Sequence, residues 1–199
     1  MLYCMRSQMD YRIEDDLFIT HNCFMNSSNL LGSCLVAMPG VDDRYFQSSL
    51  IYITYTDQSI VQGLIVNKPT DQYFSKLIDR MKLSISPSFE DQRIMMGGPL
   101  HQDQLFLLYQ SEGKMVFSSD FKDLQHMVDS DITNDYIAGI GICEWSFSDL
   151  LQEIKHNRWL FLHCHHELLL QSHYSDRMNL VLSRLGIGFE QISSESGHA

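Results

Sequence analysis

The ten residues Val61–Thr70, which read VQGLIVNKPT, decide the fold because they hold a buried strand and its abrupt end. Residues 64–66 form a continuous apolar run, which is typical of a strand that is covered on both faces. Pro69 cannot donate to a strand ladder, and it favours extended geometry at Lys68, the residue before it. The strand is therefore predicted to end at Asn67 and Lys68.

The residues after this strand predict a helix and, at the junction, a candidate ligand site. Thr70 is expected to cap the helix, whose first turn carries Asp71. Asn67 and Lys68 would then lie where a central strand hands over to a helix, and strand ends are where α/β proteins usually bind ligands. The alternative, which is commoner for isolated residues of these types, is that Asn67 caps a turn and Lys68 extends its ammonium group into solvent.

Hydrophobic patterns on both sides of these residues predict further strands and helices. The stretch 50–55 is rich in β-branched and aromatic residues and is expected to form a hairpin with the 61–66 strand. Apolar residues at helical spacing predict helices near 73–81 and 178–185, the second closed by Gly186. Other strands are expected at 34–38, 94–96, 105–109, 115–117, 136–142 and 159–162, and other helices after Asp120 and Ser146. Strand pairs and single helices occur without strict βαβ alternation, which indicates one domain of the α+β (mixed α/β) class.

Five motifs, in this order, resemble the AlgH/YqgE family. Residues 37–39 with Asp43, Phe46 and Ser49 are similar to AMPxxxDPxFxxS, 63–69 to GxIVNKP, 97–99 to GGPV, 141–160 to GxxGWxxGQLExEIxxNxWL, and 197–199 to a GHA terminus. The resemblance implies a twisted, partly barrel-like β-sheet surrounded by helices. It also implies a group of small bacterial proteins with no settled biochemical activity, often labelled transcriptional regulators.

The resemblance also divides the chain. It covers residues 29–199, which we expect to form an AlgH/YqgE-like domain. Residues 1–28 are polar and unpatterned, so we expect a poorly ordered N-terminal extension, with Met25 as an alternative start. Within the domain, Glu144, Ser148, Asp149 and Leu151 replace the family's Gly, Gly, Gln and Glu. A function that needs those four family residues is therefore not implied here.

Composition limits the classes of function. The net charge is -11, and no run of Lys and Arg occurs, so direct contact with nucleic acid is not expected. No apolar run approaches the roughly 18 residues that a membrane helix needs, and the N-terminal segment lacks the pattern of a signal peptide. The five cysteines are odd in number and form no CxxC motif, which favours reduced thiols in a cytoplasmic protein.

Standard catalytic and metal signatures are incomplete in this sequence. The Gly139–Gly141 segment lacks the third glycine of a dinucleotide motif, because Glu144 takes that position. His166 and Glu167 begin like HExxH, but Leu170 stands in place of the second histidine. The cluster His163-Cys164-His165-His166 offers ligands that suit zinc or copper. Family members usually have Pro-Ala-Asp at its first three positions, so we expect an exposed polar loop and predict no metal and no cofactor.

The candidate ligand site combines residues of several motifs. Gly97 and Gly98 allow a nest of backbone amides that holds an anion, with Lys68 as the counter-charge; the alternative is a tight turn without a ligand. Trp145 either walls a pocket or packs in the core. We predict that five residues lie close together, because their motifs fall at strand ends or turns: Asn67, Lys68, Gly97, Gly98 and Trp145. The candidate ligand-binding set is Ser49, Asn67, Lys68, Pro69, Gly97, Gly98, Pro99 and Trp145, with no catalytic residue assigned.

The predicted function is a soluble, non-enzymatic binding or regulatory module. It would act on transcription through a small anionic ligand or a protein partner. One alternative is a regulator that binds DNA directly, which a basic surface patch would favour. The other is an enzyme that uses Lys68 or a thiol in a strand-end pocket, which a deep cleft around a perturbed Lys68 would favour.

Overall fold

The computed structural model describes residues 27–83, 91–129 and 135–186 of the 199-residue chain. Most of the predicted extension, and the GHA terminus, lie outside the described residues, so the predicted domain boundary stays a prediction. The strands are β1 (Ser33–Ala37), β2 (Leu50–Thr56), β3 (Ile60–Ile65), β4 (Pro69–Tyr73), β5 (Arg93–Met96), β6 (Leu100–Ser111), β7 (Lys114–Ser118), β8 (Tyr136–Ser146) and β9 (Trp159–His163). The helices are α1 (Ser27–Leu30), α2 (Phe74–Arg80), α3 (Phe121–Asp129), α4 (Phe147–Lys155), α5 (His166–Leu170) and α6 (Arg177–Ser183).

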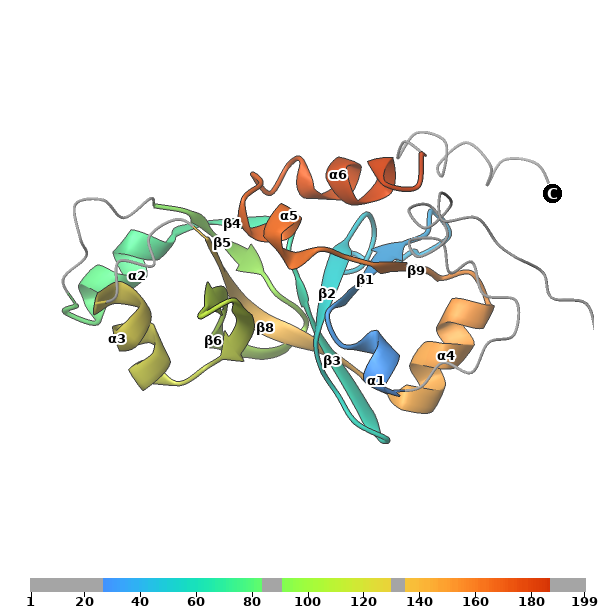
Figure 1. Cartoon of the computed structure of the whole chain (residues 1–199), viewed down its shortest axis with the longest axis horizontal. Coiled ribbons are helices and arrows are strands. Elements are labelled where there is room, and N and C mark those ends of the chain that lie inside the picture. Colours follow the sequence, from blue (N-terminus) through green and yellow to red (C-terminus); the bar gives the residue numbers. More distant parts are fainter. Residues whose placement is uncertain (1–26, 84–90, 130–134, 187–199) are drawn as a thin grey trace, which may run out of the picture.

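The strands form one mixed, nine-stranded sheet that strand β8 joins in the middle (Figure 1). Its path runs β4-β5-β8-β3-β2-β1-β9, and β6 pairs with β8 and β7 outside this path. Gly139 and Ile140 of β8 lie between parallel β5 and antiparallel β6, whereas residues 143–146 pair with β3. The sheet is open rather than a closed barrel, because β4 and β9 end its path. The predicted mixed α/β class in a single domain is confirmed.

The apolar run of residues 64–66 forms the end of β3, in the centre of the sheet, and the residue after it. Leu64, Ile65 and Val66 are completely buried, as a strand covered on both faces requires. The predicted hairpin is confirmed, since β2 pairs antiparallel with β3. Its turn is held by Asp57, whose carboxylate accepts the backbone N–H groups of Ser59 and Ile60.

The prediction of a helix directly after this strand is wrong. Residues Pro69–Tyr73 form strand β4 at one end of the sheet, where the missing N–H group of proline costs no ladder bond. Thr70 caps no helix: its hydroxyl donates to the carbonyl of Ile94 (2.8 Å) and accepts the N–H of Gln72 (3.2 Å). Helix α2 begins later, at Phe74.

The start of α2 explains why the predicted cap at Thr70 is wrong. Its cap residue, Tyr73, makes no side-chain capping bond. Instead the carboxylate of Asp91, distant in sequence, accepts from the backbone N–H (2.9 Å) and the hydroxyl (2.6 Å) of Ser75. The cap therefore comes from another segment, and Asn67 and Lys68 connect two strands rather than a strand and a helix.

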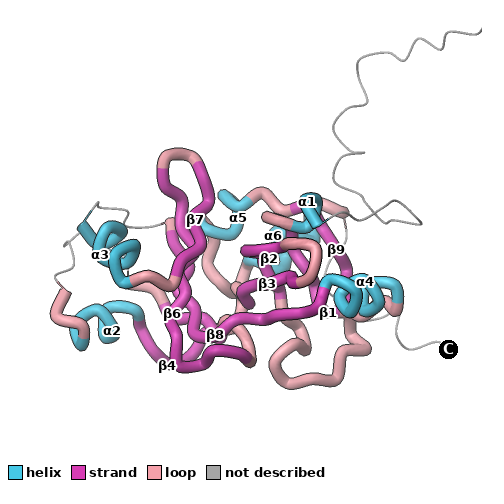
Figure 2. The backbone as a smooth tube through the Cα atoms, turned by 90° about the horizontal axis from the view of Figure 1, so that it is seen from below, coloured by secondary structure: helices cyan, strands magenta, loops and turns pink. Residues whose placement is uncertain are grey.

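Helices cover both faces of the sheet. Because successive side chains of a strand point to opposite faces, alternate residues of β1 pack in two different cores. Cys34 and Val36 pack with residues of α5 and α6. Leu35 and Ala37 point the opposite way and pack with residues of α1 and α4. A third core lies in the other half of the molecule, where α2 and α3 pack on β5, β6 and β8 (Figure 2).

Several local predictions are confirmed by the observed turns and caps. The hydroxyl of Ser146 accepts the N–H of Asp149 (3.0 Å) and caps α4. Gly186 follows α6 with a φ of 69°, the left-handed conformation that ends helices. Gly113 turns β6 into β7 with a φ of 75°, and Figure 2 shows this hairpin projecting from the sheet.

Candidate functional site

The structure brings the Asn67–Lys68 and Gly97–Gly98 segments side by side. The N–H of Met96 donates to the carbonyl of Lys68 (2.7 Å), and the N–H of Ile65 donates to the carbonyl of Gly97 (2.8 Å). Pro69 lies beside the same segment, because it pairs with Met95 across β4 and β5. These two motifs therefore form one junction in the middle of the fold.

Asn67 and Lys68 both hold the segment Asp43–Ser49, here called the 43–49 loop. The Oδ1 atom of Asn67 accepts the N–H of Leu50 (2.8 Å), and its Nδ2 atom donates to the carbonyl of Ser48 (2.9 Å). The Nζ atom of Lys68 donates to the carbonyls of Tyr45 (2.7 Å) and Arg44 (3.4 Å). Partial burial lowers the pKa of Lys68, and the nearby carboxylate of Asp43 opposes this shift.

These contacts leave Lys68 little freedom to serve a ligand. An ammonium group has three donors, and two of those of Lys68 point to main-chain carbonyls of the 43–49 loop. Ser49 ends the loop and is completely buried, with its main-chain carbonyl accepting from Ala37 (3.0 Å). Within the described residues its hydroxyl has no hydrogen-bond partner. The ligand-binding role of this set stays a prediction.

The glycines of the GGP segment allow backbones to pack closely. The N–H of Gly97 donates to the carbonyl of Ile140 (2.8 Å), so it is not available to an anion. A Cβ atom on Gly98 would overlap the backbone of Ile142, and Gly141 has a φ of 79° against the same segment. Pro99, which is half-buried, leads from this contact into β6. The two segments thus form a tight crossing in which a side chain has no room.

Trp145 belongs to the core beneath the 43–49 loop. Its ring centroid lies 5.9 Å from that of Phe46 and 5.8 Å from that of Trp159. The indole N–H of Trp159 donates to the carboxylate of Glu153 (2.6 Å), so α4 is tied to the same cluster. Through Phe46, Trp145 supports the loop that Asn67 and Lys68 hold from the other motif.

The side chains of the His163–His166 cluster diverge. The Nδ1 atom of His163 lies 3.3 Å from the hydroxyl of Ser33, and the Nε2 atom of His166 lies 3.5 Å from the amide nitrogen of Gln110. Within the described residues, no group of three or more His, Cys, Asp or Glu side chains is arranged to hold a metal ion. Every helix of the described part is too short or too polar to span a bilayer.

A cavity of about 510 Å³ lies between the β4–β5 edge and the α5–α6 segment. Its lining includes residues that can recognise anions or planar groups: Tyr73, Arg93, His173, Tyr174 and Arg177. The sequence predictions did not name this cavity or any of these residues as a site. We refer to it as the α5–α6 cavity.

Arg177, at the start of α6, is the buried cation of this cavity. Its side chain is 2% exposed. Its Nε atom donates to the carbonyls of Leu169 (2.8 Å) and Ser172 (3.2 Å), and its Nη1 atom donates to the carbonyl of Val66 (2.5 Å). Within the described residues, Arg177 makes no ion pair with a carboxylate, and its Nη2 atom makes no hydrogen bond; this atom is not fully buried, so it is accessible from the cavity. Burial lowers the pKa of Arg177 to about 10.

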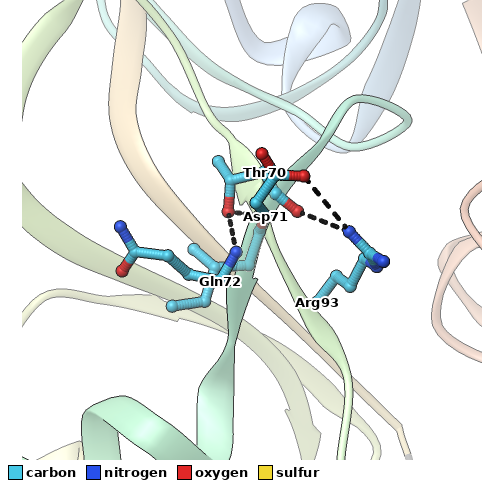
Figure 3. Close-up of polar contacts among 5 residues, drawn as sticks. Thr70, Asp71, Gln72 and Arg93 are labelled. Carbon is cyan, nitrogen blue, oxygen red and sulfur yellow. Dashed lines mark hydrogen bonds and ion pairs between the residues drawn. The ribbon is translucent and has the colours of Figure 1, made fainter.

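Arg93 supplies a second cation, on the opposite wall. Its Nη1 atom donates to the carbonyl of Thr70 (3.2 Å) and lies 3.6 Å from the carboxylate of Asp71 (Figure 3). Asp71 is fully exposed, so this ion pair contributes little. The guanidinium of Arg93 also lies over the ring of Tyr73, 5.1 Å from its centroid. Arg93 is thereby positioned without a strong counter-charge.

A signal for Arg177 does exist in the sequence. Arg177 lies four residues before Val181, so both residues fall on the buried, apolar face of α6. An arginine on such a face is either buried and paired or snorkelling, and spacing alone cannot distinguish the two. The acceptors of Arg177 are main-chain carbonyls. Every residue has such a carbonyl, so the sequence does not indicate which ones accept from Arg177.

The fold and the cavity define a single-domain mixed α/β protein with an arginine-lined pocket beside its sheet. The AlgH-like family model matches residues 34–190, and the chain belongs to this family. A UPF0301 protein of Shewanella frigidimarina is 32% identical over 178 residues, which are 83% of this chain and 96% of that protein. One of Nitrosomonas eutropha is 28% identical over 88% of this chain and 100% of that protein.

Solved structures show the same fold. The solution structure of AlgH from Pseudomonas aeruginosa aligns with a TM-score of 0.67 and 22% identity, over 89% of this chain and all of that one. The crystal structure of DIP2367 from Corynebacterium diphtheriae aligns with a TM-score of 0.65 and 18% identity, over 85% of this chain and 92% of that one. The predicted family is confirmed, and the family remains without an assigned activity.

Proposed function

We propose that this protein is a non-enzymatic binding module that takes a small anionic ligand into the α5–α6 cavity. The observation that carries the proposal is the buried guanidinium of Arg177, which has no carboxylate partner among the described residues. A buried charge is costly unless a counter-charge and hydrogen bonds compensate it. An anion in the cavity supplies both, through the Nη2 atom that the protein leaves without an acceptor.

The size of the cavity and the second arginine agree with this function. Small-molecule sites usually enclose about 300–1,000 Å³, and this cavity encloses about 510 Å³. Arg93 lines the facing wall, so an anion can meet two guanidinium groups, which form strong and directional contacts with carboxylates and phosphates.

The role we propose is regulatory, in the cytoplasm, and passes through this ligand or a protein partner. An effect on transcription would then need no contact with DNA, which a net charge of -11 disfavours. Catalysis by Lys68 has less support, because its ammonium group donates to the carbonyls of Tyr45 and Arg44.

Titration with inorganic phosphate, followed by thermal melting and by calorimetry, tests the binding site. A ligand that binds only the folded protein raises the melting temperature. We expect this for the wild type, and a roughly ten- to hundredfold weaker affinity for Arg177→Met and Arg93→Gln, since a charge-assisted contact contributes about 1.5–3 kcal/mol.

Arg158→Gln is the matched control, because this arginine is exposed on the turn after α4 and, within the described residues, forms hydrogen bonds through its main chain alone. It should bind phosphate like the wild type. Equal affinity in all four proteins would contradict the site. If Arg177→Met does not fold, Arg93→Gln still decides the question, because its arginine is half-exposed.

A further inference from the structure

We propose that the ligand of the α5–α6 cavity is a planar ring that carries a single anionic group; this inference rests on the proposed function. Two pairs of planar side chains line the cavity, one from each wall. On the sheet side, the guanidinium of Arg93 lies over the ring of Tyr73, 5.1 Å from its centroid. On the helix side, the rings of His173 and Tyr174 lie 3.9 Å apart at an interplanar angle of 39°.

Each of these planar side chains makes contacts that orient it. The Nδ1 atom of His173 lies 2.8 Å from the hydroxyl of Ser175, which orients the imidazole. Tyr174 is partly buried and packs against the core beneath α5 and α6. Tyr73 is held from the other side by the guanidinium of Arg93, which is itself bonded to Thr70. Rings and guanidinium planes of this kind stack on the faces of flat ligands.

The volume of the cavity also exceeds what an inorganic anion needs. A water molecule occupies about 30 Å³ of liquid, so a cavity of about 510 Å³ has room for an anionic group and a ring of one or two cycles. The buried Arg177 marks the place of the anionic group, and the ring would occupy the space between the two walls.

The charges around the cavity limit the ligand to one anionic group. The lining combines two arginines, Arg93 and Arg177, with two carboxylates, Asp91 and Asp135, and among the described residues neither arginine forms an ion pair with either of these carboxylates. The carboxylate of Asp91 already accepts from Ser75. A polyphosphate would bring further negative charge toward these two carboxylates, and like charges repel. A carboxylate or a monophosphate on a ring fits this balance.

Pairs of compounds that differ only in the ring test the inference. Phenyl phosphate and cyclohexyl phosphate share charge and similar size, and benzoate and cyclohexanecarboxylate form the corresponding carboxylate pair. Calorimetry should give about tenfold tighter binding for the aromatic member of at least one pair, because an aromatic ring stacks on aromatic side chains and a saturated ring does not. The pair that binds more tightly distinguishes a phosphate from a carboxylate ligand.

Variants of the walls test the same point in the protein. Tyr174→Leu should reduce the aromatic preference and leave the affinity for inorganic phosphate unchanged. Tyr73→Leu should reduce the aromatic preference too, and it should also weaken phosphate binding, because the guanidinium of Arg93 lies over this ring. Tyr55→Leu is the control, because this tyrosine is 47% exposed on β2 and does not line the cavity. Equal binding of the aromatic and saturated compounds would overturn the inference and leave the anion site standing. Failure of every compound, inorganic phosphate included, would remove the proposed function as well.

Discussion

The side-chain amide of Asn67 joins two points of the 43–49 loop to the end of β3. It accepts from the N–H of Leu50 and donates to the carbonyl of Ser48, so both of its polar atoms are used. Asn157, another motif residue, has a φ of 55° just after α4, a conformation that asparagine tolerates better than most residues. Both motif residues have clear structural reasons for their identity.

Substitution of Asn67 should therefore reduce stability. Asn67→Ala leaves the N–H of Leu50 without its acceptor, and we expect a loss of about 1–3 kcal/mol in the free energy of unfolding. Asn67→Asp keeps an acceptor for this N–H and should lose less. Urea unfolding measures both.

Asn179→Ala is the control for this comparison, because Asn179 is exposed on α6 and should change stability by no more than about 0.5 kcal/mol. A stability of Asn67→Ala equal to that of the wild type would show that the loop does not depend on this amide.

At the scale of secondary structure, the crossing of β8 with the Gly97–Gly98 segment is the tightest packing in the described part of the fold that involves glycine. Gly98→Ala places a Cβ atom against the backbone of Ile142. Ile142 cannot move away without disturbing its pairing with Leu100. We expect a loss of about 2–4 kcal/mol or failure to fold, measured by urea unfolding.

Gly40→Ala is the matched control, because a Cβ atom there meets nothing within 4 Å. This variant should be neutral, or stabilised by less than about 1 kcal/mol, since alanine restricts the unfolded chain. Equal stabilities of Gly98→Ala and Gly40→Ala would contradict the close approach.

Elements whose signals are local could be predicted from the sequence. Ser146 caps α4 through an N–H three residues away, and Gly186 ends the last helix through its own backbone conformation. The Pro69–Tyr73 segment could not be assigned in this way. Its strand depends on pairing with β5, whose paired residues lie twenty or more positions later, and the cap of α2 comes from Asp91.

The candidate site shows the same limit. The positions of the motifs predict that Asn67, Lys68 and Gly97 lie close together, and they do, because these residues flank neighbouring strands. The α5–α6 cavity instead arises where a sheet edge meets a helical segment about eighty residues further along the chain. Nothing in the local pattern around Arg177 reveals that its acceptors are the carbonyls of Val66, Leu169 and Ser172.

For the whole molecule, charge decides which large partners are compatible. A net charge of -11 opposes approach to a phosphate backbone. We expect DNA affinity no tighter than the non-specific range, about 10⁻⁴–10⁻⁶ M at physiological salt, with little dependence on sequence. An electrophoretic mobility assay with specific and scrambled duplexes measures this, and tight, sequence-selective binding by the purified protein would overturn it.

The two tryptophans lie where their intrinsic fluorescence can report on the structure around them. Trp145 and Trp159 both contact Phe46, at 5.9 and 5.5 Å between ring centroids, so their fluorescence reports on the 43–49 loop. They belong to the core on the face of β1 opposite to α5 and α6, whereas tyrosines line the cavity. Two hydrogen bonds at consecutive residues nevertheless connect the cavity with the 43–49 loop. Arg177 donates to the carbonyl of Val66, and the side-chain amide of Asn67, the next residue, donates to the carbonyl of Ser48 in the loop. A shift in tryptophan emission when an anion fills the cavity would therefore show that binding on one face of the sheet changes the surroundings of the tryptophans on the other.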